Sequence, residues 1–186
     1  MIGYALTGSF CTVQRSLAVL QELILYNDVL PIASATVAST DTRFGKAADT
    51  LKRLEDICGK KPITTVKEAE PLGPALPLDT LVICPCTGNT LAKLANGITD
   101  TAVTMAAKAH LRNGRPLIIA IATNDGLSQS LKNLAVMLNR KNVYFVPFGQ
   151  DDPESKPSSL VADFSLVSKT VEKAREGIQL QPVLLR

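Results

Sequence analysis

The sequence is poor in the residues that metal sites and disulfide frameworks require. Its 186 residues include one histidine, four cysteines and no tryptophan, and aromatic residues make up only 4%. So few cysteines, without a secretory context, do not form a disulfide scaffold, so we expect reduced thiols. The closest cysteines, Cys84 and Cys86, are spaced more tightly than the usual zinc pair, and no second pair accompanies them. The sequence therefore predicts no metal site.

Long apolar runs and blocks of one charge are also missing. No apolar run reaches the roughly 20 residues that a membrane-spanning helix needs, and residues 1–6 lack the basic and apolar segments of a secretory leader. The 20 Lys and Arg residues stand against 17 Asp and Glu residues, and the net charge of +3 is spread along the chain. We therefore expect a cytoplasmic protein that binds neither nucleic acid nor a membrane.

Short apolar segments alternate with segments of helical periodicity through most of the chain. This alternation is typical of parallel strands joined by right-handed helical crossovers, with helices on both faces of the sheet. We predict an α/β fold: a single-domain flavodoxin- or Rossmann-like three-layer sandwich over residues 1–186, with a mostly parallel sheet of about six strands. The expected strands are residues 2–6, 29–37, 62–64, 80–84, 117–122 and 143–146.

Two helices have specific sequence signals. Asp100 is the expected N-cap of a helix over residues 101–113, which Gly114 ends. A stripe of leucines at helical spacing marks the second helix: Leu127, Leu131, Leu134 and Leu138.

The C-terminal part is predicted to be less regular. Residues 149–159 are polar and contain Pro153 and Pro157, which indicates a long loop. A C-terminal helix at about residues 160–176 follows. The extended tail, residues 178–186, is apolar for a terminus, and we expect it to pack against a neighbouring subunit.

In an open parallel sheet, ligands bind beyond the carboxyl ends of the strands, so the loops there are the candidate sites. Thr7-Gly8-Ser9 joins a strand to a helix and is either a phosphate site or an ordinary tight turn. Residues 39–44 offer hydroxyls for phosphate oxygens, or for a helix N-cap. Residues 85–100 begin with several hydroxyls and an amide side chain. These groups could hold a ring and a ribityl chain of a ligand by hydrogen bonds, or they could simply form a capped loop. Asn124-Asp125-Gly126 either approaches a ligand or is simply a turn.

Two nucleotide motifs are missing. Gly8 stands without the other two glycines of the dinucleotide fingerprint, and no acidic residue ends the second strand to hold a ribose. The chain also lacks the P-loop lysine motif. A self-contained nicotinamide dinucleotide site is therefore disfavoured.

Pro85-Cys86-Thr87-Gly88-Asn89-Thr90 resembles the Pro-Ala-Ser-Ala-Asn-Thr signature of a flavoprotein family. That family includes phosphopantothenoylcysteine decarboxylase, lantibiotic cysteine decarboxylases and flavin prenyltransferase. Leu6-Thr7-Gly8-Ser9 resembles its first FMN loop. Further segments resemble one branch of it, the B subunits of dipicolinate synthase, over nearly the whole chain: residues 39–45, 70–74, 105–108, 111–114 and 144–151.

The resemblance implies a flavodoxin-like fold, FMN, and homotrimers or multiples of trimers. It places Gly8, Ser9, Ser39 and Thr42 near the phosphate and ribityl end of FMN, and Thr87, Asn89 and Thr90 near the flavin or its substrate. The residues assigned to FMN are Thr7, Gly8, Ser9, Ser39, Thr42, Pro85, Thr87, Asn89 and Thr90.

The narrower resemblance implies a partner, the A subunit, and a small dicarboxylate substrate. The reaction would be oxidation of a dihydrodipicolinate-type intermediate to dipicolinate during sporulation. Because this chain lacks a dinucleotide fingerprint, the A subunit would hold the NADP or NAD. By loop position, Arg43, Lys93 and Lys108 are candidate cations for a dianionic substrate, although an exposed salt bridge is the commoner fate of each.

The departures from the family pattern leave the catalytic residues unassigned. Residues 37–83 contain no histidine where the decarboxylases carry theirs, and the single histidine, His110, falls within a helix. The Met-rich substrate clamp has no counterpart in residues 122–126, and Thr123 stands where flavin prenyltransferases place a basic residue. Two alternatives stay open: a non-redox scaffold that has lost FMN affinity, and a stand-alone FMN-dependent decarboxylase or prenyltransferase.

Overall fold

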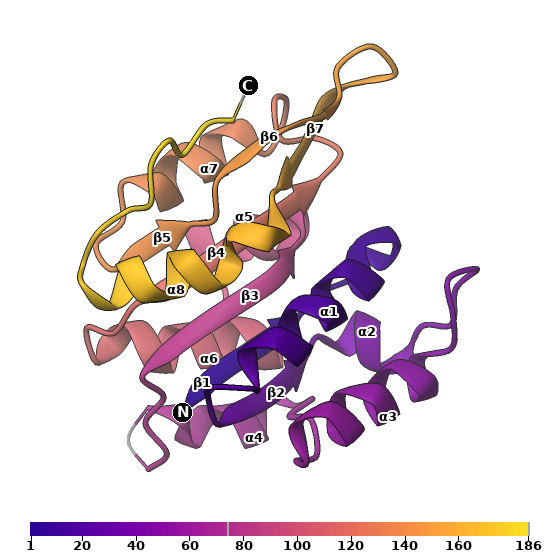
Figure 1. Cartoon of the computed structure of the whole chain (residues 1–186), viewed down its shortest axis with the longest axis vertical. Coiled ribbons are helices and arrows are strands. Elements are labelled where there is room, and N and C mark those ends of the chain that lie inside the picture. Colours follow the sequence, from indigo (N-terminus) through magenta and orange to yellow (C-terminus); the bar gives the residue numbers. More distant parts are fainter. Residues whose placement is uncertain (74, 186) are drawn as a thin grey trace.

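A computed structural model describes residues 1–73 and 75–185; Pro74 and Arg186, each the last residue of a segment named above, lie outside the described residues. The chain forms one α/β domain built around a seven-stranded, mostly parallel sheet (Figure 1). The predicted fold class is confirmed, with one strand more than expected. The strands are β1 (Ile2–Leu6), β2 (Val29–Ala33), β3 (Thr80–Cys86), β4 (Leu117–Thr123), β5 (Val143–Phe145), β6 (Phe148–Asp152) and β7 (Lys156–Ala162).

The sheet divides at β4. Strands follow the order β2-β1-β3-β4-β7-β6, and the first four are parallel. Beyond β4, its first half pairs in parallel with β5, whereas its last residues, Ala122 and Thr123, pair antiparallel with β7. This division carries the β6–β7 hairpin past the carboxyl ends of the central strands, where ligands bind in such sheets.

Helices cover both faces of the sheet. They are α1 (Val13–Leu23), α2 (Ala35–Ser39), α3 (Ala47–Cys58), α4 (Val66–Ala69), α5 (Gly88–Ala95), α6 (Ala102–Arg112), α7 (Leu131–Leu138) and α8 (Val167–Arg175), with 3₁₀ turns η1 (Phe10–Thr12), η2 (Glu70–Leu72) and η3 (Phe164–Leu166). Helices α1 and α8 lie side by side on one face, and α5 and α6 lie on the other (Figure 1).

A buried polar network fixes α1 on the sheet. The Tyr4 hydroxyl, fully buried on β1, lies 2.9 Å from both the carbonyl oxygen and the Oγ of Ser16. Ser16 Oγ donates in turn to the carbonyl of Cys84 on β3. Since every polar atom in this chain of contacts has a partner, the helix and two strands are held in one register without an unsatisfied group.

Some predicted boundaries are corrected by local hydrogen bonds. The strand expected over residues 29–37 ends at Ala33, because Ser34 accepts a hydrogen bond from the Val37 amide and starts α2. Asp100 is not the N-cap of α6; Thr101 is, in a reciprocal capping box with Thr104. The short strand expected at residues 62–64 is a single bridge between Ile32 and Ile63.

The C-terminal region differs most from expectation. The polar segment 149–159 is not a loop, because most of it forms the β6–β7 hairpin. The final helix begins at Val167 instead of near residue 160, and Leu127 lies in the turn before α7. The tail pairs with β6 of its own chain, the Phe148 amide donating to the Val183 carbonyl and the Leu185 amide to the Phe148 carbonyl, and its packing against a neighbouring subunit stays a prediction.

Candidate functional site

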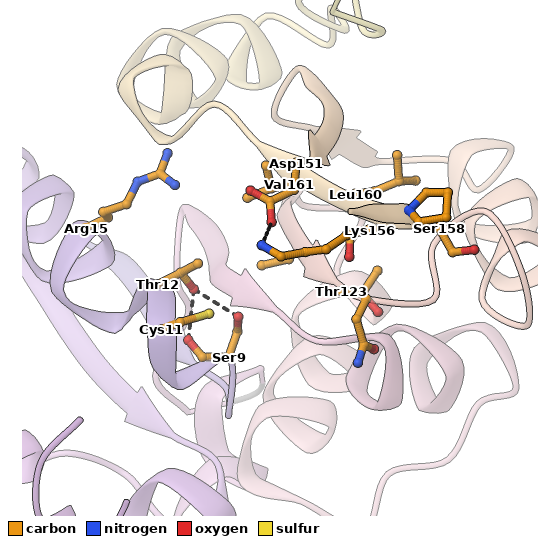
Figure 2. A pocket seen from close by; sticks show the side chains of 14 residues that line it. Ser9, Cys11, Thr12, Arg15, Thr123, Asp151, Lys156, Ser158, Leu160 and Val161 are labelled. Carbon is orange, nitrogen blue, oxygen red and sulfur yellow. Dashed lines mark hydrogen bonds and ion pairs between the residues drawn. The ribbon is translucent and has the colours of Figure 1, made fainter. Parts of the chain in front are cut away.

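Two adjoining cavities open at the carboxyl ends of β1, β3 and β4. The smaller, about 470 Å³, lies among the loops that follow these strands. The larger, about 700 Å³, extends from the start of α1 to the β6–β7 hairpin (Figure 2). Both are lined by Ser9, Cys11, Ala122, Thr123 and Asn124. Volumes in this range suit a cofactor and a small substrate in neighbouring positions.

Thr7 ties the first two loops together below the smaller cavity. Its hydroxyl donates to the carbonyl oxygen of Pro85 at 2.8 Å and accepts from the Thr87 amide at 2.9 Å. The side chain is buried, so it serves the scaffold and does not line the cavity. Thr7 and Pro85 therefore position the cavity wall from behind.

The start of α5 presents polar groups to the smaller cavity. Thr87 is the N-cap: its hydroxyl accepts from the Thr90 amide, and its carbonyl accepts from the Leu91 amide. The amides of Gly88 and Asn89 precede this first helical bond, so they are the ones left for a ligand. Thr87, Gly88 and Asn89 all line the cavity. Thr90 is buried against Thr87 and supports the cap.

The loop after β1 supplies the opposite wall. Thr12 donates to both the carbonyl oxygen and the Oγ of Ser9, at 2.9 and 3.0 Å (Figure 2). Because Ser9 Oγ accepts that bond, its own proton is available to a ligand oxygen. Gly8 lines the same cavity beside it.

The second predicted loop lies differently from expectation. Ser39 Oγ donates to the Ala35 carbonyl at the end of α2, and Ser39 lines neither of the two cavities. Thr42 Oγ1 accepts from the Phe44 amide, and Thr42 lines a separate space of about 20 Å³. The residues of this loop that reach the smaller cavity are Arg43 and Phe44, with the Arg43 guanidinium 4.8 Å above the Phe44 ring.

The β6–β7 hairpin and α1 add charged groups that the sequence interpretation did not assign. Asp151 accepts a hydrogen bond from Lys156 Nζ at 2.7 Å, and this contact raises the pKa of Lys156 (Figure 2). Across the larger cavity, the Arg15 guanidinium lies 5.1 Å from the centre of the Phe164 ring. A Pro-containing polar turn between the apolar residues Phe148 and Leu160 is the signal that could have indicated a hairpin.

The loop after β4 is organised by one carboxylate. Asp125 Oδ1 accepts hydrogen bonds from the hydroxyls of Thr123 and Ser130. The Asp125 carbonyl accepts from the amides of Ser128 and Ser130. This loop is thus an ordered part of the cavity wall, and Thr123, Asn124 and Asp125 line the smaller cavity.

The other titratable candidates lie elsewhere. His110 is fully buried on α6 with Nε2 2.8 Å from the Pro116 carbonyl, and it lines neither cavity. Lys93 is paired with Asp100 at 2.8 Å, and Lys108 lies on α6, away from both cavities. Burial raises the pKa of Cys84 to about 11 and that of Cys86 further, so both remain thiols at neutral pH.

Metal-ligand clusters and membrane-spanning helices are absent from residues 1–73 and 75–185. This part of the chain contains no group of three or more His, Cys, Asp or Glu side chains that could hold a metal ion. Within the same residues, no helix is both long enough and apolar enough to cross a membrane.

Comparison with known proteins decides the family. The family model described as Flavoprotein matches residues 1–172. The chain belongs to the Flavoprotein family. Within this family it is similar to the B subunit of dipicolinate synthase from Bacillus subtilis (strain 168), with 48% identity over 99% of this chain and 92% of that protein.

Solved structures agree with the family assignment. The crystal structure of the dipicolinate synthase B subunit from Bacillus halodurans C superposes with a TM-score of 0.91 and 42% identity, covering 100% of this chain and 95% of that one. The FMN-dependent cysteine decarboxylase SpaF, at 21% identity and a TM-score of 0.65, covers 93% of this chain and 95% of its own, and shares the fold. The flavoprotein fold therefore extends over essentially the whole chain.

Proposed function

We propose that this chain is the FMN-binding subunit of a two-subunit dipicolinate synthase that acts during sporulation. With a separate A subunit, it would oxidise a dihydrodipicolinate-type dicarboxylate to dipicolinate. The dihydropyridine gives up a hydride equivalent and a proton as its ring becomes aromatic, and NADP or NAD held by the A subunit accepts the hydride. Similarity to the Bacillus subtilis protein over 99% of this chain supports this choice.

The observation that carries the proposal is the continuity of the two cavities through Ser9, Thr123 and Asn124. We assign FMN to the smaller one. Its wall combines the two free amides at the start of α5 with the Ser9 hydroxyl and the Asn89 amide, which are groups that bind phosphate and ribityl oxygens. Phe44 supplies an apolar side for a ring. The residues present therefore fit a flavin mononucleotide.

The larger cavity then takes the dicarboxylate next to the flavin. Arg15 and Lys156 line it. Arg15 brings a positive charge with no carboxylate partner among the described residues, whereas Lys156 is paired with Asp151, as Lys93 is with Asp100. A bound flavin would supply electron-transfer chemistry at the boundary between the cavities. The two cavity linings contain no histidine, and their carboxylates are already engaged, Asp151 by Lys156 and Asp125 by the hydroxyls of Thr123 and Ser130. We therefore expect the A subunit to supply the proton acceptor.

The flavin part is tested by purifying the chain from riboflavin-supplemented cells and recording its visible absorption, with mass spectrometry of any released ligand. We expect bound FMN, and about tenfold weaker binding for Asn89→Ala, because one hydrogen bond to a charged or polar ligand is lost. Asn139→Ala, on the exposed end of α7, is the matched control and should bind as the parent chain does.

A colourless protein that also fails to bind added FMN would overturn the flavin assignment and favour the non-redox scaffold. The partner is tested separately, by assaying dihydrodipicolinate oxidation with each subunit alone and with both. We expect activity from the pair only. Full activity of the A subunit alone would exclude a role for this chain in the reaction.

A further inference from the structure

A third cavity lies at the other end of the sheet. It occupies about 550 Å³ between the end of α5, one face of α6 and the turn before β5. The segments before β4 and β5 border this cavity, so it sits at the amino ends of these strands. The smaller and larger cavities described above, here called the flavin-side cavities, open at the carboxyl ends. It shares no lining residue with either of them.

Four cations line this cavity, and no acidic residue does. Lys108 and Arg112 come from α6, and Arg140 and Lys141 from the turn after α7. Among residues 1–73 and 75–185, none of the four forms an ion pair with a carboxylate. We call it the basic cavity.

The arrangement places like charges together from two separate elements. Lys108 and Arg112 are four residues apart on one helix face, a spacing at which equal charges repel. The dipole of α6 favours cations in its last turn, but it does not account for Arg140 and Lys141, which belong to another segment. Arg140 is also fixed in place, because its Nη1 donates to the Leu94 carbonyl at 3.2 Å.

The acidic residue next to this lining in the sequence does not relieve the repulsion. Asp100 follows Thr99, which lines the basic cavity, but both Asp100 carboxylate oxygens accept from Lys93 Nζ at 2.8 Å. Asp100 itself is not among the lining residues. The positive charge of the cavity is therefore left for an external anion.

Part of the remaining lining is apolar, beside the polar residues Thr99, Thr104 and Asn142. Leu94, Ile98 and Leu111 contribute hydrocarbon surface between the cations, and Ile98 is 46% exposed, although large apolar side chains usually avoid water. Inorganic ions gain nothing from such a surface, whereas a flat organic body buries it. The volume falls in the range of small-molecule sites.

We propose that the basic cavity binds a small organic molecule that carries at least two acidic groups, carboxylates or phosphates, on an apolar body. Two acidic groups match the two pairs of cations, one pair on α6 and one in the turn before β5. This ligand would bind apart from the two flavin-side cavities. The basic cavity therefore serves a second ligand, and this proposal does not depend on the proposed function.

The test is isothermal titration of the full chain with benzene-1,3-dicarboxylate, benzoate and inorganic pyrophosphate. We expect saturable binding of the dicarboxylate, at least tenfold weaker binding of the monoanion benzoate, and weakening of binding with added salt. Tighter binding of pyrophosphate, which has no apolar body, than of the dicarboxylate would show that charge alone selects the ligand and would overturn the proposal. Failure of all three probes to bind saturably would overturn the proposal.

Variants locate the binding. Lys108→Ala combined with Arg112→Ala should weaken dicarboxylate binding at least tenfold. This variant should fold, because alanine favours helix and removes the repulsion, so its melting temperature without ligand should be at least that of the parent. Lys169→Ala, exposed on α8, is the control and should bind normally.

Two results would assign the binding or the cavity elsewhere. Loss of binding in Lys156→Ala, but not in the α6 double variant, would place the probe in the larger flavin-side cavity and overturn the proposal. A change in oligomeric state of the α6 double variant without ligand, measured by light scattering, would show the cavity to be a contact between copies and would also overturn it.

Discussion

Gly88 approaches Asp125 so closely that a Cβ atom on the glycine would lie 2.7 Å from the carboxylate Oδ1. The same Cβ would lie 2.6 Å from Thr123 Oγ1 and 2.8 Å from Ser130 Oγ. All three oxygens belong to one hydrogen-bonded group, so none can move alone. The glycine in the signature segment therefore allows the loop after β4 to pack directly on the start of α5.

Gly88→Ala should destabilise the protein by about 1–3 kcal/mol, because the new methyl group overpacks a rigid polar cluster. Urea denaturation measures the change. Gly8→Ala is the control, since the nearest atom to its Cβ would be a Thr36 methyl group at 3.2 Å, and its other contacts would be at ordinary van der Waals distances, so we expect a smaller loss. An unchanged midpoint for Gly88→Ala would mean that the loop after β4 adjusts freely.

Thr7→Val should also destabilise the fold, by about 1–3 kcal/mol. Valine has a similar shape but leaves the Pro85 carbonyl and the Thr87 amide without their buried partner. Thr7→Ser keeps the hydroxyl and should recover most of the stability. Chemical denaturation of the three proteins checks this, and equal stability of the valine and serine variants would show that the hydroxyl bridge contributes nothing.

The position of the site at one edge of the sheet was predictable from the sequence. The runs at residues 2–6, 80–84 and 117–122 are continuously apolar because β1, β3 and β4 are buried on both faces. Carboxyl ends of adjacent parallel strands meet at one edge, so Gly8 and Ser9 lie near Thr87 and Asn89.

The hairpin and the exact caps were not predictable in the same way. Strands β6 and β7 reach beyond the sheet into solvent, so Gln150, Asp151 and Lys156 are exposed and the usual apolar alternation is absent. Competing N-caps decide other helix boundaries. The hydroxyls of Ser34 and Thr101 each accept a hydrogen bond from the backbone amide three residues on, and sequence alone does not say which polar residue does so.

Lys156→Ala should raise the KM for the dicarboxylate about three- to tenfold and leave kcat nearly unchanged. The reason is that the Lys156 ammonium lines the larger cavity, where it would exchange its Asp151 partner for a substrate carboxylate and bind the substrate and the transition state alike. Steady-state kinetics of the complex with the A subunit tests this, and the effect should shrink in high salt. Lys169→Ala is the control. A fall in kcat at constant KM would contradict a binding role for Lys156.

Acid should destabilise the protein through His110. Burial lowers the pKa of this histidine, and Nδ1 is the one buried side-chain nitrogen or oxygen atom without a hydrogen-bond partner among the described residues. With Nε2 at the Pro116 carbonyl, protonation would place an unpartnered N–H at Nδ1 in the core. The unfolded chain binds this proton at its ordinary pKa of about 6.5.

The sign of the pH effect follows from this difference. Stability from the neutral imidazole is fully present above pH of about 6.5, and it is lost as pH falls from there toward the folded pKa, with a limiting slope of about 1.4 kcal/mol per pH unit. Urea denaturation at pH 7.5 and 5.5 should therefore show a larger acid loss for the parent than for His110→Gln, which keeps a donor but does not titrate. Equal acid losses in both proteins would exclude His110 as the cause.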